Sequence, residues 1–256
     1  MVTPAPPGSR AGNRVTALRW AAILRELGHV VAIAEKLPAR CDALVAIHAR
    51  KSYRAVQDFR ARHRDRPLVV LLAGTDLYGD LRTSAAARAS LELADRLLVL
   101  QPDATSVLPE RFHAKVRVVR QSVARPRGLP RPRPDAFEAC VVAHLRPVKD
   151  PFRAALAARR LPAESRLSVV HVGAATTETM RRQAVAEEAR NPRWRWLGEL
   201  PREATLIRVA SSRLLVLPSK MEGGANVVSE AIVLGVPVLS SRISGSVGIL
   251  GEDYPG

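Results

Sequence analysis

The residues best suited to chemistry lie in one segment, KMEGGANVVSEAIVLGVPV, at positions 220–238. It follows an apolar run, 214–217, that is typical of a buried strand, and two glycines directly precede an expected helix. Glycines in such a turn let the backbone approach a ligand closely. The free N–H groups and the positive end of the helix dipole then suit a phosphate group. The predicted phosphate-binding turn comprises Gly223, Gly224, Ala225 and Asn226.

Two glutamates accompany this turn. Glu230 lies within a helical pattern, 225–234, that is apolar nearly all round and therefore predicts a buried helix. A buried carboxylate needs a partner or a ligand. Glu222 lies about two helical turns earlier and is expected to face the same cleft. An alternative stays open on these residues alone, in which Glu230 caps a neighbouring amide and Glu222 is solvated.

A second polar turn, HLRPVKDP, begins at His144 and follows a strand pattern that ends at Ala143. In open α/β sheets, ligands bind at the carboxyl ends of the strands. Arg146 and Lys149 on this turn can place positive charge on a diphosphate. Loop cations are often simply solvated. These two gain a role only if the sheet order brings their turn beside the two glycines.

The first half of the chain offers two further turns. The loop 3–14, TPAPPGSRAGNR, leads into a helix and is either an anion-binding mouth for a second substrate or an ordinary flexible loop. Its candidate binding residues are Arg10, Gly12, Asn13 and Arg14. The turn AGTDLY carries Thr75 and Asp76, which either face the cleft beside that substrate or cap a helix. Capping is the simpler explanation.

Strand and helix patterns alternate about every 12 to 20 residues, which predicts an α/β fold of βαβ units with parallel sheets. The expected strands span 29–34, 43–48, 67–73, 96–100 and 115–119 in the first half, and 138–144, 167–172, 195–197, 213–217 and 236–239 in the second. The expected helices span 15–27, 51–64, 83–93, 151–160, 176–189, 202–210 and 225–234. The apolar face expected for the first helix comprises Val15, Leu18, Ala22 and Leu27.

The segment 124–135, ARPRGLPRPRPD, separates the two halves. Its prolines can neither continue a helix nor enter a central strand, so it predicts a stiff, extended linker. Residues 1–123 and 136–256 are then two Rossmann-like domains. Because the second alternation stops at Gly256 without closing helices, we expect the C-terminal end to be incomplete.

The formal net charge is +16, with 35 Arg against 5 Lys. The arginines are scattered over every segment, and aromatic residues make up only 4% of the chain, too few for a base-stacking platform. We therefore expect no nucleic-acid partner. The charge is better interpreted as a solvated surface together with a cleft that handles anions.

No apolar stretch reaches the roughly 18 residues of a membrane span, and the start of the chain has no apolar signal-peptide core. Cys41 and Cys140 fit no metal-ligand spacing. We expect both to be free thiols, buried as small hydrophobic residues in a reducing cytosol. These features together predict a cytoplasmic protein.

Several segments together resemble the GT-B glycosyltransferases of the glycogen-synthase-like family four. Glu222 and Glu230 match the E-x7-E pair of that family, within EGGANVVSEAIVLGVPVLSS. AHLRPVKDP matches its GRL-x-x-x-K-x-P element, with Lys149 at the lysine. His144 stands where that element has an arginine, so Arg146 becomes the candidate for the pyrophosphate contact.

The resemblance implies GT-B architecture, with two Rossmann-like domains that face each other across a cleft. The N-terminal domain would bind an acceptor and the C-terminal domain a UDP-sugar. RWLGELPREA resembles the family's loop beside the nucleobase and places Leu197 there. Glu230 would bind the ribose hydroxyls, and Glu222 would lie by the sugar. Lys149, Arg146 and the amides of the glycine turn would stabilise charge on the β-phosphate as UDP leaves. No metal or cofactor is implied, because no Asp-x-Asp element is present.

A narrower resemblance covers nearly the whole chain. TPAPPGSRAGNRVTALRWAAILRELGH, LAGTDLY, HLRPVKDPF and EGGANVVSEA together look like the selenosugar synthases of selenoneine biosynthesis. That family joins the sugar of UDP-N-acetylglucosamine or UDP-glucose to selenophosphate. Selenophosphate is already an anionic nucleophile, so it needs cations such as Arg10 and Arg14 more than a strong general base. The alternatives are a family-four enzyme with a hydroxyl or lipid-linked acceptor, a UDP-sugar epimerase, and a nucleic-acid-binding protein.

Overall fold

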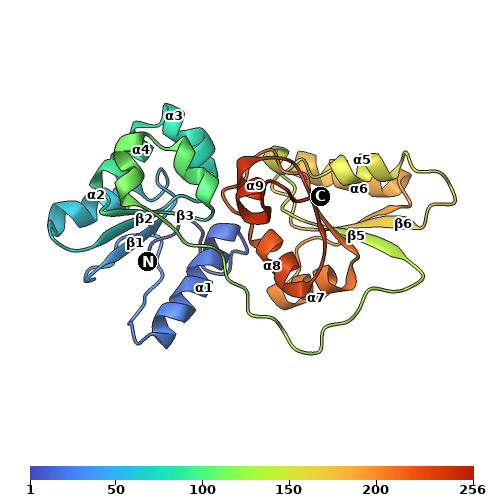
Figure 1. Ribbon diagram of the computed structural model, residues 1–256, viewed down its shortest axis with the longest axis horizontal. Helices are drawn as coiled ribbons and strands as arrows, with labels where there is room; N and C mark the ends of the chain where they lie inside the picture. The colour runs from blue at the N-terminus through green and yellow to red at the C-terminus, as the bar shows by residue number, and fades with distance from the viewer. The chain divides into compact units, whose positions relative to one another are not determined.

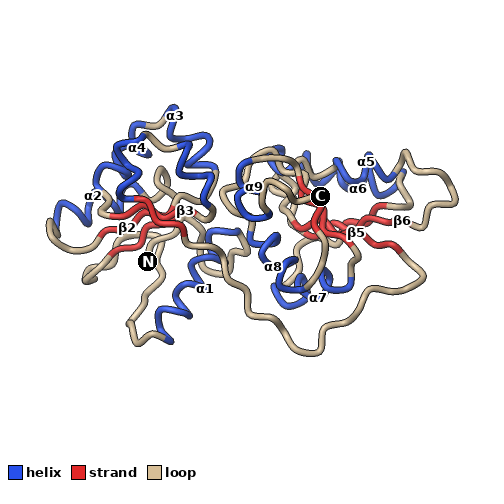
Figure 2. Tube along the Cα trace, viewed as in Figure 1, coloured by secondary structure: helices blue, strands red, loops and turns tan.

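The computed structural model describes all residues from Met1 to Gly256, and they form two compact units. The first unit contains Met1–Ser122, Glu222–Asn226 and Val247–Glu252, and the second contains Val123–Met221, Val227–Ser246 and Asp253–Gly256. Each unit is built on one parallel β-sheet with helices on its faces (Figure 1, Figure 2). The predicted α/β class is confirmed.

The sheet of the first unit has the strand order β1-β2-β3-β4. Its strands are β1 (Leu44–Ile47), β2 (Leu68–Leu71), β3 (Arg96–Val99) and β4 (Val116–Val118). Its helical segments are α1 (Gly12–Glu26), α2 (Tyr53–Arg62), the π-helical turn η1 (Asp76–Asp80), α3 (Leu81–Thr83), α4 (Ala85–Leu93) and two 3-10 helices, η2 (Pro102–Val107) and η3 (Glu110–Lys115). In Figure 1, α2 and α4 lie on one face of this sheet and α1 on the other. β1 and β2 are apolar throughout, as is usual for strands covered on both faces, whereas β3 and β4 each contain an exposed arginine.

The helix α1 packs through its smallest residues. It buries Ala17 and Ala21 in a cluster with Ile47 of the sheet. Leu18 and Leu27, which belonged to the predicted apolar face, are 49% and 69% exposed, so that prediction is wrong. Methyl side chains let the helix axis come close to the sheet, and the larger Trp20 and Leu24 pack half-buried against the same cluster.

Residues 29–34 do not form the predicted strand. Only Ala34 makes a bridge, with Val2, and Val2 in turn bridges Ala46 of β1. Val30 is fully exposed, whereas Val31 and Ile33 are half-buried against the cluster that α1 forms with the sheet. The extended chain at Val2 lies between this segment and β1, and its hydrogen bonds to the segment reach only Ala32 and Ala34, which is too short a pairing for a regular strand. Every other predicted strand and helix is confirmed, with differences of a few residues at the ends.

The sheet of the second unit has the strand order β7-β6-β5-β8-β9. Its strands are β5 (Phe137–Val142), β6 (Leu167–Val172), β7 (Trp194–Trp196), β8 (Leu214–Leu217) and β9 (Val238–Ser240). The helices that follow Ser122 are the 3-10 turn η4 (Pro147–Lys149), α5 (Arg153–Ala158), α6 (Glu178–Arg190), α7 (Arg202–Ser211), α8 (Asn226–Leu234) and α9 (Ser244–Leu250). In Figure 1, α5 and α6 cover one face of the sheet, and α7 and α8 the other. Sequence patterns did not predict α9, whose Gly and Ser content gives it low helix propensity.

Burial of α8 is extensive but incomplete. Val228, Glu230 and Ala231 are buried, as predicted. Ile232 is 52% exposed, so the prediction that the helix is buried all round is wrong on that side. The helix therefore has a core-facing stripe that includes one carboxylate.

The two cysteines differ in environment. Cys140 lies in β5 and is fully buried, whereas Cys41 is only half-buried, contrary to the prediction for both. Burial, together with the charge of Glu138, raises the pKa of the Cys140 thiol to about 12.

Because the thiolate is the reactive form, we expect iodoacetamide at pH 8 to alkylate Cys41 while Cys140 stays unmodified until the protein unfolds. Mass spectrometry of a time course checks this, and equal rates at the two thiols would contradict it.

Candidate functional site

The strand order of the parallel sheet in the second unit reverses between β5 and β8. From β5 the chain runs through β6 to β7 on one side, and it then returns to form β8 and β9 on the other. The loops that leave the carboxyl ends of β5 and β8 therefore diverge, and in α/β sheets ligands bind in the crevice at such a switch point. These loops are the two polar turns predicted from the sequence. They are joined by a hydrogen bond of 2.9 Å from the amide of Lys220 to the carbonyl of Val148.

A third loop, after β6, fixes the loop after β5. Gly173 has a φ of 151°, and a Cβ at this position would collide with the carbonyl oxygen of Ala143. The amide of Ala174 donates to Nδ1 of His144 at 3.2 Å, and its carbonyl accepts from the amide of Leu145 at 2.9 Å. The carboxyl ends of β5 and β6 are thus held as one rigid platform.

His144 is neutral in this platform. Its Nδ1 accepts an amide hydrogen, so Nε2 carries the ring proton. Burial lowers the pKa of His144; Glu199 opposes this shift, whereas Arg146 and Lys149 add to it. A neutral imidazole can donate one hydrogen bond to a phosphate oxygen, but it does not supply the charge of an arginine. The positive charge of this loop therefore comes from Arg146 and Lys149.

Those two cations lie within a single short turn. Lys149 ends the 3-10 helix η4, and its amide donates to the carbonyl of Arg146 at 2.9 Å. Asp150 follows in a left-handed conformation with a φ of 45°, and its carboxylate accepts from Arg153 at 2.7 and 2.9 Å. The nearest acidic residue in sequence is therefore paired with a third cation, Arg153.

Glu230 is 5% exposed and has the partner that its burial requires. Its Oε1 accepts a hydrogen bond of 2.7 Å from Nη1 of Arg202, the first residue of α7. Burial raises the pKa of Glu230, and the charge of Arg202 acts against that shift. The sequence predicted a buried carboxylate that needs a partner or a ligand; its burial is confirmed, and the sequence did not identify Arg202. The two residues are 28 positions apart on different helices, and no local pattern pairs them.

The remaining predicted donor residues follow the strands of the same sheet. Glu222 and the glycine turn occupy the segment between β8 and α8, and Asn226 is the first residue of α8. Leu197 directly follows β7, and its amide donates to the carbonyl of His171 at 2.9 Å. The structure therefore places these residues at the carboxyl ends of β7 and β8, or at the start of α8.

In the first unit, the N-terminus of α1 lacks a side-chain cap and has no acidic residue in its first turn. Gly12 and Asn13 begin the helix, Arg14 lies in its first turn, and Arg10 lies in the loop before it. Nε and Nη1 of Arg14 are buried and have no hydrogen-bond partner. Because an unpaired buried guanidinium is unfavourable, this group suits an anionic ligand.

Asp76 shapes the turn after β2. Its carboxylate is fully buried and accepts backbone hydrogen bonds of 2.8 to 3.1 Å. The four donors are the amides of Ala49, Ala73, Gly74 and Leu77. Asp76 is therefore a positioning residue of this turn and presents no carboxylate to a ligand, which corrects its place among the predicted acceptor contacts.

His48 is a residue that the sequence analysis missed. It ends β1 with a left-handed φ of 79°, it is 2% exposed, and its Nε2 lies 3.1 Å from Oγ1 of Thr75. Burial lowers the pKa of His48, although Asp76 acts in the opposite direction. A histidine directly after an apolar strand pattern was a usable signal in the sequence. Its left-handed backbone, its burial and its contact with Thr75 required the tertiary structure.

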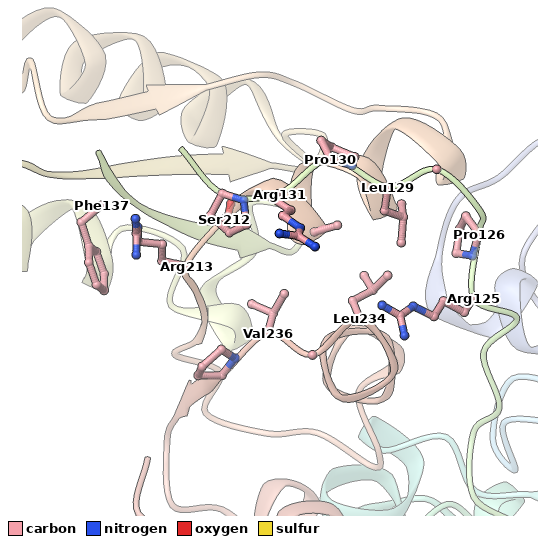
Figure 3. Close-up of a pocket in the computed structure, with 15 residues that line it drawn as sticks. Arg125, Pro126, Leu129, Pro130, Arg131, Phe137, Ser212, Arg213, Leu234 and Val236 are labelled. Atoms are coloured by element: carbon pink, nitrogen blue, oxygen red, sulfur yellow. The ribbon is translucent and has the colours of Figure 1, made fainter. Parts of the chain in front are cut away.

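The second unit also has a cavity of about 630 Å³ at the opposite end of its sheet (Figure 3). It lies beside the residues that precede or begin β5, β8 and β9, including Phe137, Arg213 and Val236, and the linker forms its other wall. In Figure 3, Arg125 and Arg131 point into this space. Because it adjoins the amino ends of the strands, it is separate from the crevice at their carboxyl ends.

Comparisons with known proteins agree with this arrangement. Residues 130–256 match the family described as Glycosyl transferases group 1. The structure is similar to HepE of Anabaena in complex with UDP-glucose, with 19% identity, a TM-score of 0.60, and coverage of 80% of this chain and 61% of that one. Sucrose-phosphate synthase from Thermosynechococcus elongatus gives 15% identity, a TM-score of 0.64, and coverage of 96% and 66%. A UDP-forming trehalose-phosphate synthase from Burkholderia xenovorans gives 14% identity, a TM-score of 0.63, and coverage of 93% of this chain and 64% of that one.

The chain has the GT-B fold. It spans 61% to 66% of the length of these GT-B structures. Lys149, Glu222 and Glu230 all fall within the region that matches this family. None of the helices is both long and apolar enough for a membrane span.

The close approach of Gly173 to Ala143 generates one prediction. Substitution G173A places a methyl group against a backbone carbonyl, and we expect it to lower the free energy of unfolding by about 2 kcal/mol or more, measured by urea denaturation. Gly79→Ala is the matched control, because Gly79 has open space at its Cβ and no positive φ. Equal stability of the two variants would show that the platform tolerates a side chain.

The buried carboxylate of Asp76 generates a second prediction about stability. In Asp76→Asn one oxygen becomes an amide nitrogen that cannot accept, so backbone donors lose a partner, and we expect a loss of about 2–4 kcal/mol in unfolding free energy. Asp42→Asn, at a fully exposed side chain, is expected to change stability by less than about 0.5 kcal/mol. Unchanged thermal and urea midpoints for Asp76→Asn would contradict the positioning role.

Proposed function

We propose that this protein is a glycosyltransferase that joins the sugar of a UDP-sugar, UDP-N-acetylglucosamine or UDP-glucose, to selenophosphate. The products are a 1-seleno-sugar, UDP and phosphate. The observation that carries the choice of acceptor is that Nε and Nη1 of Arg14, in the first turn of the uncapped helix α1, are buried and without a hydrogen-bond partner. A neutral sugar hydroxyl could accept hydrogen bonds from them but would not compensate the positive charge, whereas a phosphate group would do both.

The donor half of the proposal is supported by the switch-point crevice. Lys149 and Arg146 supply charge from the loop after β5, and the glycine turn supplies amides ahead of α8. In this proposal Glu230 on α8 accepts from the ribose hydroxyls, and Leu197, which follows β7, lies beside the nucleobase. HepE, whose fold is similar, has been crystallised with UDP-glucose, which is consistent with a UDP-sugar donor here.

In the proposed reaction, selenium donates an electron pair to C1 of the sugar. The bond from C1 to the β-phosphate oxygen breaks, and its electrons remain on UDP. Lys149, Arg146 and the amides of the glycine turn stabilise this developing charge, the role usually served by preorganised donors. Hydrolysis of the phosphorus–selenium bond by water then gives phosphate and the seleno-sugar. Because selenophosphate is already anionic, the first step needs no strong general base.

Anaerobic turnover of UDP-N-acetylglucosamine with and without selenophosphate tests this function. We expect release of UDP that depends on selenophosphate, as measured by chromatography. We also expect a selenium isotope pattern on the sugar product in mass spectrometry. UDP binding without selenophosphate-dependent turnover would reject the acceptor and retain the donor, and UDP-glucose and hydroxyl acceptors would be tried next. No affinity for UDP would reject the glycosyltransferase assignment.

Charge reversal at the proposed acceptor site provides a specific prediction. Arg14→Glu is expected to raise the KM for selenophosphate at least about tenfold, or to abolish turnover, because it replaces an attraction with a repulsion. The Kd for UDP should stay unchanged. Arg54→Glu, at an exposed arginine of α2, is the matched control and should leave the KM unaltered. Unchanged kinetics for Arg14→Glu would exclude Arg14 from the acceptor site.

The leaving-group cation provides a second prediction. Lys149→Ala is expected to lower kcat by about 100-fold or more, since the positive charge acts on the β-phosphate as UDP departs. Lys36→Ala, at an exposed lysine, controls for loss of charge alone. A KM effect without a kcat effect would show that Lys149 binds the donor but does not assist its departure.

A further inference from the structure

Buried glutamates of the second unit fall into two kinds. Glu187 accepts from Asn191 on Oε1 and from Arg190 on Oε2, so both of its oxygens are engaged. Glu138, which is partly buried, likewise engages both oxygens with Arg208. These carboxylates are saturated by the protein, as groups with only a structural role should be.

Glu230 is different. It is 5% exposed, yet only one hydrogen bond reaches it from the protein, from Arg202 to Oε1. Oε2 has no protein partner, and it is not fully sealed from solvent. A largely buried carboxylate that keeps one oxygen available is suited to accept a hydroxyl hydrogen from a ligand.

Arg202 is placed to control that oxygen. It begins α7, it is 44% exposed, and it reaches Glu230 on α8 across 2.7 Å. Burial by itself favours the protonated form of Glu230, and the guanidinium opposes this, so the pKa shift is smaller than burial alone would produce. A protonated carboxyl would lose much of its capacity as an acceptor. The same hydrogen bond also limits rotation of the carboxylate about its terminal bond.

We propose that Arg202 is a positioning residue for the nucleotide: it holds Glu230 ionised and oriented so that the carboxylate accepts from the ribose hydroxyls, and it thereby sets the preference for a ribonucleotide over a 2′-deoxyribonucleotide. The inference rests on the proposed UDP-sugar site. Arg202 acts through Glu230 and need not touch the ligand. A purely structural ion pair would stabilise the fold without any effect on recognition of the 2′-hydroxyl.

The test compares Kd values for UDP and 2′-deoxy-UDP by isothermal titration calorimetry. For the unaltered chain we expect UDP to bind about tenfold more tightly or better, the difference made by one hydrogen bond to a charged acceptor. In Arg202→Gln the ratio should fall to about threefold or less, mainly through weaker UDP binding, and Arg202→Lys should lie between the two. Arg181→Gln removes an Arg–Glu pair on the exposed side of α6 and should leave the ratio unchanged.

A second variant keeps the test decisive if Arg202→Gln is poorly folded. Glu230→Gln removes the charge and retains the shape, and it should reduce the ratio as Arg202→Gln does. The double variant should show no further loss, because both changes interrupt one interaction. An unchanged ratio in Arg202→Gln, or equal weakening of both nucleotides, would overturn the inference while leaving the UDP site in place. Failure of the unaltered chain to bind UDP would instead overturn the site and the inference together.

Discussion

The reversal of strand order between the parallel neighbours β5 and β8 is the constraint on which the second unit depends. In a parallel sheet with the order β7-β6-β5-β8-β9, the loops after these two neighbouring strands must turn toward opposite sides. Two polar turns that are more than 60 residues apart in the chain are thereby brought together at one edge, where the amide of Lys220 meets the carbonyl of Val148. Within the second unit, this topology joins the turn that carries Arg146 and Lys149 to the start of the turn that follows β8.

Close backbone packing then makes that position rigid. The loop after β6 presses on the loop after β5 at Gly173, where no side chain fits. Two hydrogen bonds between Ala174 and its neighbours on the β5 loop fix the ring of His144 and its tautomer. A site that must stabilise charge on a departing diphosphate benefits from groups that need not reorganise, and this platform supplies them.

Two buried carboxylates of the scaffold are fully hydrogen-bonded by the protein. Asp76 gives both oxygens to backbone amides and so fixes a turn of the first unit. Glu187 is similarly saturated in the second. Glu230 and Arg14, by contrast, retain buried or nearly buried polar atoms that the protein leaves without a partner. Such residual capacity is unfavourable in an empty fold and is consistent with ligands that complete it.

The sequence by itself determined the elements and most of the candidate residues, because strand and helix periodicities and Gly-rich turns are local properties. It placed Lys149, Glu222 and Glu230 correctly in turns or helices at the carboxyl ends of strands. Only the tertiary structure decided that 29–34 is not a strand, since its pairing with the chain at Val2 is too short. It also decided that the residues of α1 buried most deeply against the sheet are alanines. It alone paired Arg202 with Glu230, because contacts between distant helices depend on how the sheet brings them together.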